Sequence, residues 1–193
     1  MSTELVVLLD DARRPIGTMP KAQVHTADTP LHLAFSVYVF DRQGRFLTTR
    51  RALSKRTWAG VWTNSCCGHP APGEDVADAA RRRVGQELGL TLERLEVELP
   101  DFAYRATSAE GIVENEVCPV YVALAAGDPR PDPAEVAEWR WVDWADFRLL
   151  ASAAPWAVSP WAAVQVLQLP GSLPRSAAGL ITARGSRPGP ARP

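Results

Sequence analysis

Two glutamates spaced two residues apart are the first candidates for chemistry in this chain of 193 residues. Glu114 and Glu116 lie in the apolar segment 112–124. Residues two apart in a strand share a face, and Val120 and Val122 continue that face as an apolar run. We therefore predict that both carboxylates point inward, where a cation, an arginine or a proton must neutralise them. A strand end that reaches solvent is the alternative.

The three histidines of the chain favour the cation. A divalent transition ion accepts imidazole nitrogen and carboxylate oxygen in one site. His25 and His32 flank a loop that is long enough for them to converge, and His69 lies in a separate loop. None of the three belongs to a closely spaced metal-binding pattern, so each could instead be a surface or hydrogen-bonded polar residue.

Residues 68–90 carry a more specific pattern, G-x5-E-x7-R-x-U-x-x-E-x-G-U, in which U is a bulky aliphatic residue. Its positions are filled by Gly68, Glu74, Arg82, Val84, Glu87, Gly89 and Leu90. The spacing resembles the loop–helix–loop of the Nudix superfamily, whose helix presents carboxylates to a magnesium-bound diphosphate. Arg83 and Gln86 stand where the hydrolases of that superfamily have glutamates. The pattern therefore favours binding of a diphosphate without its hydrolysis, and an exposed Arg83–Glu87 ion pair is the alternative.

Cys67 lies at the start of this loop. A free cysteine is usually a small buried hydrophobe, which is our interpretation of Cys66 and Cys118. Cys67 instead lies among glycine, histidine and proline ahead of a helix, where nearby positive charge could stabilise a thiolate.

Basic residues gather in the same part of the sequence. Arg51, Lys55 and Arg56 form a cluster just upstream of Cys67. Together with Lys21 and Arg83 they could hold a diphosphate, or they could form a solvated surface.

Taken together, the motifs closely resemble those of the type I isopentenyl-diphosphate Δ-isomerases. They are the pair His25-x6-His32, RRALSKRTW at 50–58, TNSCCGHP at 63–70, Tyr104, ENE at 114–116 and SPW at 159–161. The resemblance covers about residues 4–168. It also accounts for the departures from the hydrolase pattern, because this family uses the Nudix fold for isomerisation.

The resemblance implies two metal ions. One, Mn²⁺ or Zn²⁺ (or Mg²⁺), is held by His25, His32, His69, Glu114 and Glu116. The other, Mg²⁺, binds the substrate diphosphate together with Glu87 and the backbone carbonyl of Cys67.

The resemblance also implies the reaction and the remaining roles. The substrate is a small allylic or homoallylic diphosphate, and the reaction interconverts isopentenyl and dimethylallyl diphosphate in isoprenoid biosynthesis by protonation and deprotonation. Cys67 and Glu116 match the catalytic pair, Tyr104 assists Glu116, and Trp161 faces the reacting carbon skeleton. The residues that match the diphosphate-binding set are Lys21, Arg51, Lys55 and Arg83. A Nudix-type diphosphate hydrolase and a non-catalytic metal- or phosphate-binding module are the alternatives.

These residues need a scaffold of strands with a few helices to position them. The predicted strands are 31–41 and 45–51 as a hairpin, 92–107, 112–126 and 138–143. Helices are expected at 75–88, closed by Gly89, after Asp143, and after Pro160 with Ser159 as N-cap. This order predicts one α+β domain over residues 1–169 (motif core about 30–165), a β-sheet system flanked by helices. The resemblance implies that this is the Nudix-like mixed β-sheet system.

Composition and charge bear on the partners and the localisation of the protein. A net charge of −1 gives no electrostatic footprint for duplex nucleic acid or an anionic membrane. Residues 151–170 are uncharged, but two prolines interrupt them, so we expect a loop and a helix instead of a membrane span. With no signal-peptide pattern and with free thiols, a cytoplasmic monomer or weak dimer is expected. Residues 170–193 are rich in proline, glycine and arginine, and we expect a disordered tail.

Overall fold

A seven-stranded sheet forms the larger layer of the structure, a computed structural model that describes residues 4–171. Its strands lie in the order β12 (Val136–Val142), β5 (Phe46–Arg51), β4 (Phe35–Phe40), β11 (Val120–Ala125) and β8 (Leu92–Leu99). Two short strands extend it, since β6 (Trp62–Thr63) pairs with β5 and β7 (Cys66–Gly68) pairs with β4.

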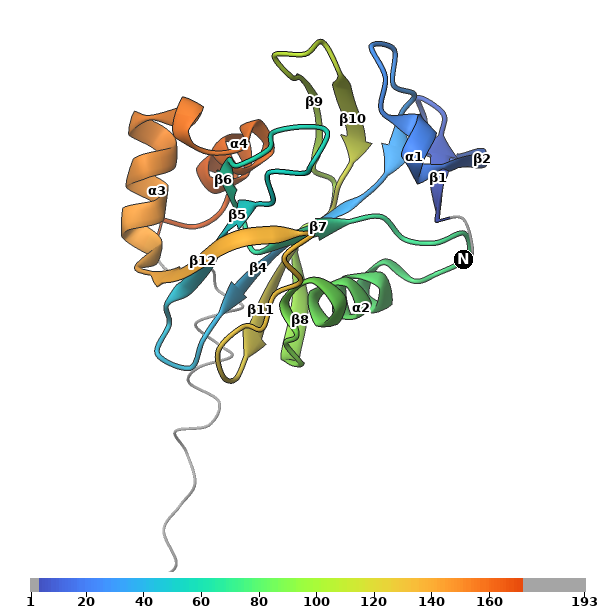
Figure 1. The fold of residues 1–193 in the computed structure, drawn as a ribbon. Helices are drawn as coiled ribbons and strands as arrows, with labels where there is room; N and C mark the ends of the chain where they lie inside the picture. The colour runs from blue at the N-terminus through green and yellow to red at the C-terminus, as the bar shows by residue number, and fades with distance from the viewer. Residues whose placement is uncertain (1–3, 172–193) are drawn as a thin grey trace, which may run out of the picture.

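Helices cover both faces of this sheet (Figure 1). Alternate residues of β4 explain why, because Tyr38 and Phe40 pack into one buried cluster with α3 (Trp144–Ala153) and α4 (Pro160–Gln168). Val37 and Val39 pack into a second cluster with α2 (Val76–Leu88). All six residues of β4 are buried, as expected for a central strand that is apolar on both faces.

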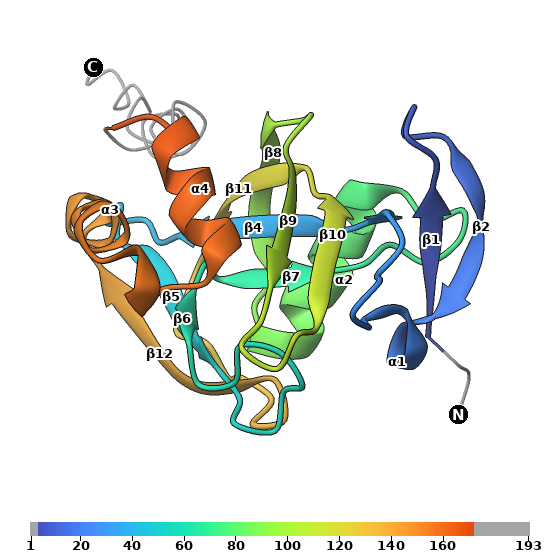
Figure 2. The same ribbon diagram turned by 90° about the horizontal axis from the view of Figure 1, so that it is seen from above.

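A five-stranded sheet runs crosswise to β4 (Figure 2). Its order is β2 (Pro15–Pro20), β1 (Leu5–Leu9), β3 (His32–Leu33), β10 (Val113–Val117) and β9 (Ala103–Thr107). The short helix α1 (Lys21–Val24) follows β2. Two chain segments, β3–β4 and β10–β11, run next to each other from the five-stranded sheet into the seven-stranded sheet. In the first sheet β3 is parallel to β10, and in the second β4 is parallel to β11.

Most predicted elements are confirmed. The β4–β5 hairpin and β12 are present, but the strand predicted at 31–41 is divided into β3 and β4, which lie in different sheets. The helix α2 begins at the N-cap Asp75 and ends at Gly89, whose φ of 64° is left-handed. The Ser159 side chain accepts a hydrogen bond from Ala162 N and so caps α4. Asp143 occupies the N-cap position of α3 but makes no capping hydrogen bond with its side chain.

The strands predicted at 92–107 and 112–126 are wrong as single elements. Each is two strands, β8 and β9 in the first case and β10 and β11 in the second, and the two halves lie in different sheets. The breaks fall at Pro100 and Pro119, because proline has no N–H to continue a ladder. β1 and β2 were not predicted.

The uncharged segment forms a loop and a helix, as expected. Residues 151–170 comprise the end of α3, a 3₁₀ turn η1 (Pro155–Ala157) and α4. Among residues 4–171, no helix is both long and apolar enough to cross a membrane. The expected disordered tail at 170–193 lies, apart from its first two residues, outside the described residues.

Candidate active site

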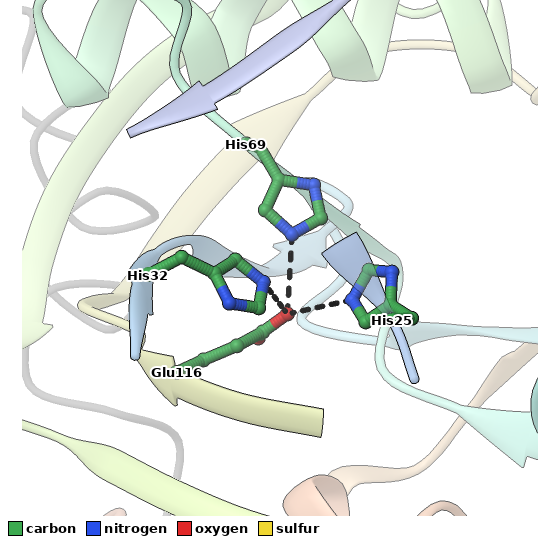
Figure 3. A group of neighbouring side chains, drawn as sticks. All are labelled: His25, His32, His69 and Glu116. Carbon is green, nitrogen blue, oxygen red and sulfur yellow. Dashed lines mark hydrogen bonds and ion pairs between the residues drawn. The ribbon is translucent and has the colours of Figure 1, made fainter. Parts of the chain in front are cut away.

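Three histidines surround one carboxylate oxygen (Figure 3). Glu116 Oε1 lies 3.1 Å from His69 Nε2, 3.4 Å from His32 Nε2 and 3.9 Å from His25 Nε2. The parallel pairing of β10 with β3 sets this arrangement, because Glu116 is in register with His32. His25 directly follows α1 and His69 directly follows β7, so four separate parts of the chain meet at this point.

The donor set fits a transition-metal ion. One ligand atom from each of these four residues lies within 4.8 Å of the other three. The buried atoms His25 Nε2 and His32 Nε2 have no hydrogen-bond partner. His32 Nδ1 lies 2.9 Å from Pro30 O, a contact that orients the ring with Nε2 toward the site. Imidazole nitrogens together with a carboxylate suit a divalent transition-metal ion.

The ionisation of these groups suits metal binding too. Burial raises the pKa of Glu116, but its close contacts with His25, His32 and His69 outweigh burial and hold that pKa well below its usual range. Burial lowers the pKa of His69 to about 4, so this ring is neutral, as a metal ligand must be. Glu114 behaves in the opposite way, because burial and the charge of Glu116 raise its pKa.

Glu114 lies beside this group of four. Its Oε1 accepts a 2.9 Å hydrogen bond from Thr57 Oγ1, and its Oε2 lies 2.7 Å from the Tyr104 hydroxyl. The same hydroxyl lies 2.9 Å from Glu116 Oε2, so Tyr104 bridges the two carboxylates. Antiparallel pairing of β9 with β10 places Tyr104 opposite Glu116. The role of Glu114 as a fifth metal ligand stays a prediction.

Cys67 lies on β7, opposite Ser36 of β4. Its Sγ is 3.4 Å from Ser36 Oγ and 3.3 Å from Asn64 Oδ1. Burial raises the pKa of Cys67 to about 12, although hydrogen bonds from Ser36 and Asn64 and the charge of Arg51 oppose the rise. Desolvation therefore outweighs the nearby positive charge and favours a neutral thiol at Cys67 over the thiolate that this charge could stabilise.

A buried polar network supports Cys67 from the α4 side. Trp161 Nε1 donates a 2.9 Å hydrogen bond to Asn64 Oδ1, and Gln165 Nε2 donates one of 3.0 Å to Ser36 Oγ. Sequence reasoning missed these supporting residues. Asn64 stood inside the motif TNSCCGHP and could have been found there, whereas nothing in the sequence singled out Ser36 or Gln165.

A cavity of about 570 Å³ brings the predicted residues together. One part, which we call the reacting end, is lined by Cys67, Tyr104, Glu116 and Trp161. Another part, the charged end, is lined by Lys21, Lys55, Arg83 and Glu87. Arg51, Arg56 and Glu114 also line the cavity, while His32 is fully buried behind it. Arg51 Nη2 donates a 3.1 Å hydrogen bond to Thr57 O, and its guanidinium lies over the Trp161 ring, 5.3 Å from its centre.

Ion pairs fill the charged end. Arg83 pairs with Glu87 one helical turn away, and both residues are buried, so an exposed surface pair is excluded. Lys55 pairs with Glu135, and Lys21 Nζ lies 3.1 Å from Glu4 Oε1.

Gly68 lets β7 pass close to Arg83. A Cβ at this position would lie 2.8 Å from the Phe35 ring and 3.0 Å from Arg83 Cγ, so a larger residue would displace the guanidinium. Close packing against Phe35 and Arg83 therefore explains why the 68–90 pattern begins with a glycine.

Comparisons with known proteins agree with these observations. A family model described as NUDIX domain matches residues 30–162. An isopentenyl-diphosphate Delta-isomerase of Frankia alni is 70% identical over 161 residues, which are 83% of each chain. A protein of the same name from Clavibacter sepedonicus is 60% identical over 176 residues, 91% of each chain.

Solved structures support the fold. The crystal structure of DR0079 from Deinococcus radiodurans matches 86% of this chain and 98% of its own, with a TM-score of 0.66 at 19% identity. A MutT protein from Methanosarcina mazei matches 72% of this chain and 92% of its own, with a TM-score of 0.57 at 19% identity.

Proposed function

The chain belongs to the isopentenyl-diphosphate Δ-isomerases of the Nudix family, and from this premise we propose that Cys67 and Glu116 carry the proton transfers of the reaction. In that reaction a double bond moves between the two ends of an allylic unit. One carbon of isopentenyl diphosphate gains a proton and a carbon two bonds away loses one, which gives dimethylallyl diphosphate. No group is lost and no electron is exchanged with a cofactor.

One observation carries this proposal: the Cys67 thiol and the Glu116 carboxylate line the same cavity. Burial raises the pKa of Cys67, whereas the three histidines lower the pKa of Glu116, so the first favours holding a proton and the second favours accepting one. The two residues come from different sheets, Cys67 from β7 and Glu116 from β10. An acid and a base from separate strands can act on different carbons of a flat substrate, which a single residue cannot do. Because the reaction is reversible, each group is the acid in one direction and the base in the other.

Tyr104 assists the carboxylate. Its hydroxyl lies within hydrogen-bond distance of both Glu114 and Glu116. Burial and the two carboxylates raise the pKa of Tyr104 well above its usual value, so the hydroxyl keeps its proton and donates a hydrogen bond to a carboxylate. Tyr104 thus holds Glu116 in place and can carry a proton to or from it.

Trp161 stabilises positive charge on the carbon skeleton. Protonation of the alkene gives a tertiary carbocation, which an aromatic face stabilises by about 2 kcal/mol or more when water is excluded. The Trp161 side chain is buried, lines the cavity and is fixed by its hydrogen bond to Asn64. An aromatic ring does this without supplying a nucleophile that would capture the cation.

A metal at the histidine cluster would be held by His25, His32, His69 and Glu116, with Glu114 as a fifth ligand. Mn²⁺ or Zn²⁺ (or Mg²⁺) bound there supplies positive charge that keeps the carboxylate ionised and oriented. At the charged end, the hard oxygens of Glu87 and of the Cys67 backbone carbonyl suit Mg²⁺ that arrives with the diphosphate. Lys21, Arg51, Lys55 and Arg83 bind the diphosphate itself, and this remote binding energy positions the reacting carbons.

We further propose a cytoplasmic enzyme that acts as a monomer or weak dimer, without nucleic-acid or membrane partners. All three cysteines are unpaired, which is typical of a reducing compartment. Size-exclusion chromatography with light scattering reports the oligomeric state directly.

The assignment is tested by incubating the purified protein with isopentenyl diphosphate and Mg²⁺. We expect dimethylallyl diphosphate and no released phosphate, and we expect Cys67→Ala to abolish the conversion. Cys118→Ala is the matched control, because it removes another buried thiol that lies outside the cavity lining and should retain turnover. Release of phosphate from diphosphate substrates would instead indicate the Nudix hydrolase, and metal uptake without turnover would indicate a binding module.

A further inference from the structure

Two carboxylates at the charged end have no role in the chemistry described above. Glu135 pairs with Lys55 and its Oε1 lies 3.5 Å from Arg83 Nη2. Glu4 Oε1 lies 3.1 Å from Lys21 Nζ and 3.8 Å from Arg83 Nη1. Both glutamates line the cavity. Three of the cations assigned to the diphosphate are therefore already paired before a diphosphate arrives.

Backbone hydrogen bonds fix the position of Glu135. Its carbonyl accepts a 3.0 Å hydrogen bond from Ala52 N, in the loop that leads to Lys55. Its N–H donates to Asp132 O, and Asp132 N in turn donates to Glu87 O at the end of α2. Glu135 is thus held between the segment that carries Lys55 and the helix that carries Arg83. Its ion pairs are not chance contacts of a long surface side chain.

Both carboxylates are ionised. Burial raises the pKa of Glu135, but its hydrogen bond and attraction to Lys55 outweigh burial and lower that pKa. Lys21 lowers the pKa of Glu4 in the same way. With Glu87 included, each of the three cations Lys21, Lys55 and Arg83 faces a carboxylate.

This balance affects which anions can enter. An anion without a metal that binds Lys55 competes with Glu135 for the ammonium group and places a second negative charge beside that carboxylate. A diphosphate that carries Mg²⁺ brings its own positive charge to the released carboxylates. In a partly buried cavity such like-charge contacts are weakly screened and therefore costly.

We propose that Glu135, assisted by Glu4, makes anion binding at the charged end depend on a divalent cation. The two residues determine specificity: they let the cavity accept metal-complexed diphosphates and reject free phosphates and metal-free diphosphates. The inference rests on the diphosphate-binding role proposed above for Lys21, Lys55 and Arg83.

The test is isothermal titration calorimetry of the full chain with inorganic pyrophosphate, without Mg²⁺ and with excess Mg²⁺. We expect the wild-type chain to bind pyrophosphate much more tightly with Mg²⁺. Glu135→Gln removes one negative charge and should tighten metal-free binding by about tenfold, while binding with Mg²⁺ changes by less than about threefold. Glu138→Gln is the matched control, because it lies on β12 and pairs with Arg50 at 3.1 Å outside the cavity lining. It should leave both affinities unchanged.

A second variant covers the case in which Glu135→Gln does not fold. Glu4→Gln removes a more exposed carboxylate and should tighten metal-free binding in the same direction by a smaller factor. Unchanged metal-free binding in the folded variants overturns the inference. Weaker binding only in the presence of Mg²⁺ also overturns it, since Glu135 would then be a magnesium ligand and not a counter-ion.

If the proposed diphosphate-binding role of the charged end is wrong, the experiment gives a different result. If Lys55→Gln leaves binding of magnesium pyrophosphate unchanged, the charged end is not the diphosphate site, and both proposals fall. If Lys55→Gln weakens that binding but Glu135→Gln changes nothing, only the inference about Glu135 fails.

Discussion

The two ends of the cavity differ in whether their polar groups have partners within the chain. At the reacting end, ring nitrogens of His25 and His32 are buried without a hydrogen-bond partner, although such a group costs about 1–3 kcal/mol. At the charged end, Lys21, Lys55 and Arg83 each face a carboxylate. The reacting end needs a further group to satisfy it, whereas the charged end is satisfied by the chain itself.

This difference separates two kinds of binding. A metal at the reacting end adds contacts that the chain alone does not supply, so it should stabilise the fold. A diphosphate at the charged end exchanges one set of partners for another, so it should change affinity more than stability. Four predictions test this contrast.

The largest effect is expected for Glu116→Gln at the reacting end. The change removes the ionised carboxylate while keeping its shape, so turnover should fall by about a thousandfold or more. Metal content measured by elemental analysis should fall with it, because Glu116 Oε1 is the point on which the histidines converge. The control variant Glu96→Gln, at an exposed position of β8, should retain wild-type turnover and metal content. A variant at position 116 with turnover within tenfold of the wild type would rule out its role as acid or base.

The second-largest effect is a gain in the free energy of unfolding when a metal ion binds. Adding Mn²⁺ or Zn²⁺ at about a hundred times its dissociation constant to metal-free protein should stabilise it by about 2.7 kcal/mol. Differential scanning calorimetry should show this as a rise in Tm of about 5–11 °C. The Tm of the His32→Asn variant should not rise when metal is added, whereas the Tm of the Lys55→Met variant should rise as it does in the wild type. An equal loss in both variants would contradict the separation of the two ends.

A smaller effect is expected for Lys55→Met at the charged end. The cation binds a part of the substrate that does not react, so KM should rise by about tenfold with a smaller change in kcat. Steady-state kinetics with isopentenyl diphosphate separates the two constants. A fall in kcat at constant KM would place Lys55 in the chemical step.

The smallest effect is a pH dependence of stability. Burial raises the pKa of Cys67 to about 12, whereas an unfolded cysteine titrates near about 8.5. Stability from this thiol is therefore complete below about pH 8.5 and is lost as pH rises toward 12, by up to about 1.4 kcal/mol per pH unit. Urea unfolding near pH 8 and pH 9.5 should show a smaller loss for Cys67→Ser than for the wild type. Equal losses would mean that the thiol is not desolvated as described.

The reacting end was largely predictable from the sequence. His25, His32, His69 and Glu116 are chemically distinctive. Strand alternation predicted that Glu116 points inward, but only the family resemblance of the motifs placed the histidines in one site with it. The ionisation of Cys67 was not predictable, because it depends on how deeply β7 is buried and not on neighbours in the sequence.

The charged end was predictable only in part. The basic residues stood out, but Glu4 and Glu135 come from distant segments, and only the folded chain brings them to Lys21 and Lys55. The split of the predicted strands could have been found in the sequence, because Pro100 and Pro119 mark both breaks, but the sheet that each half joins could not. Each half is a good strand by itself, and the sheet it joins is decided by long-range packing.

The most direct test of the central claim is incorporation of solvent deuterium. Isopentenyl diphosphate is incubated with the wild-type chain and Mg²⁺ in D₂O, and the products are analysed by NMR and mass spectrometry. We expect dimethylallyl diphosphate with deuterium on the carbon that gains a proton, and no such product from Cys67→Ala or Glu116→Gln. Deuterated product from Cys67→Ala at the wild-type rate, or release of phosphate without isomerisation by the wild type, would contradict proton transfer by this pair.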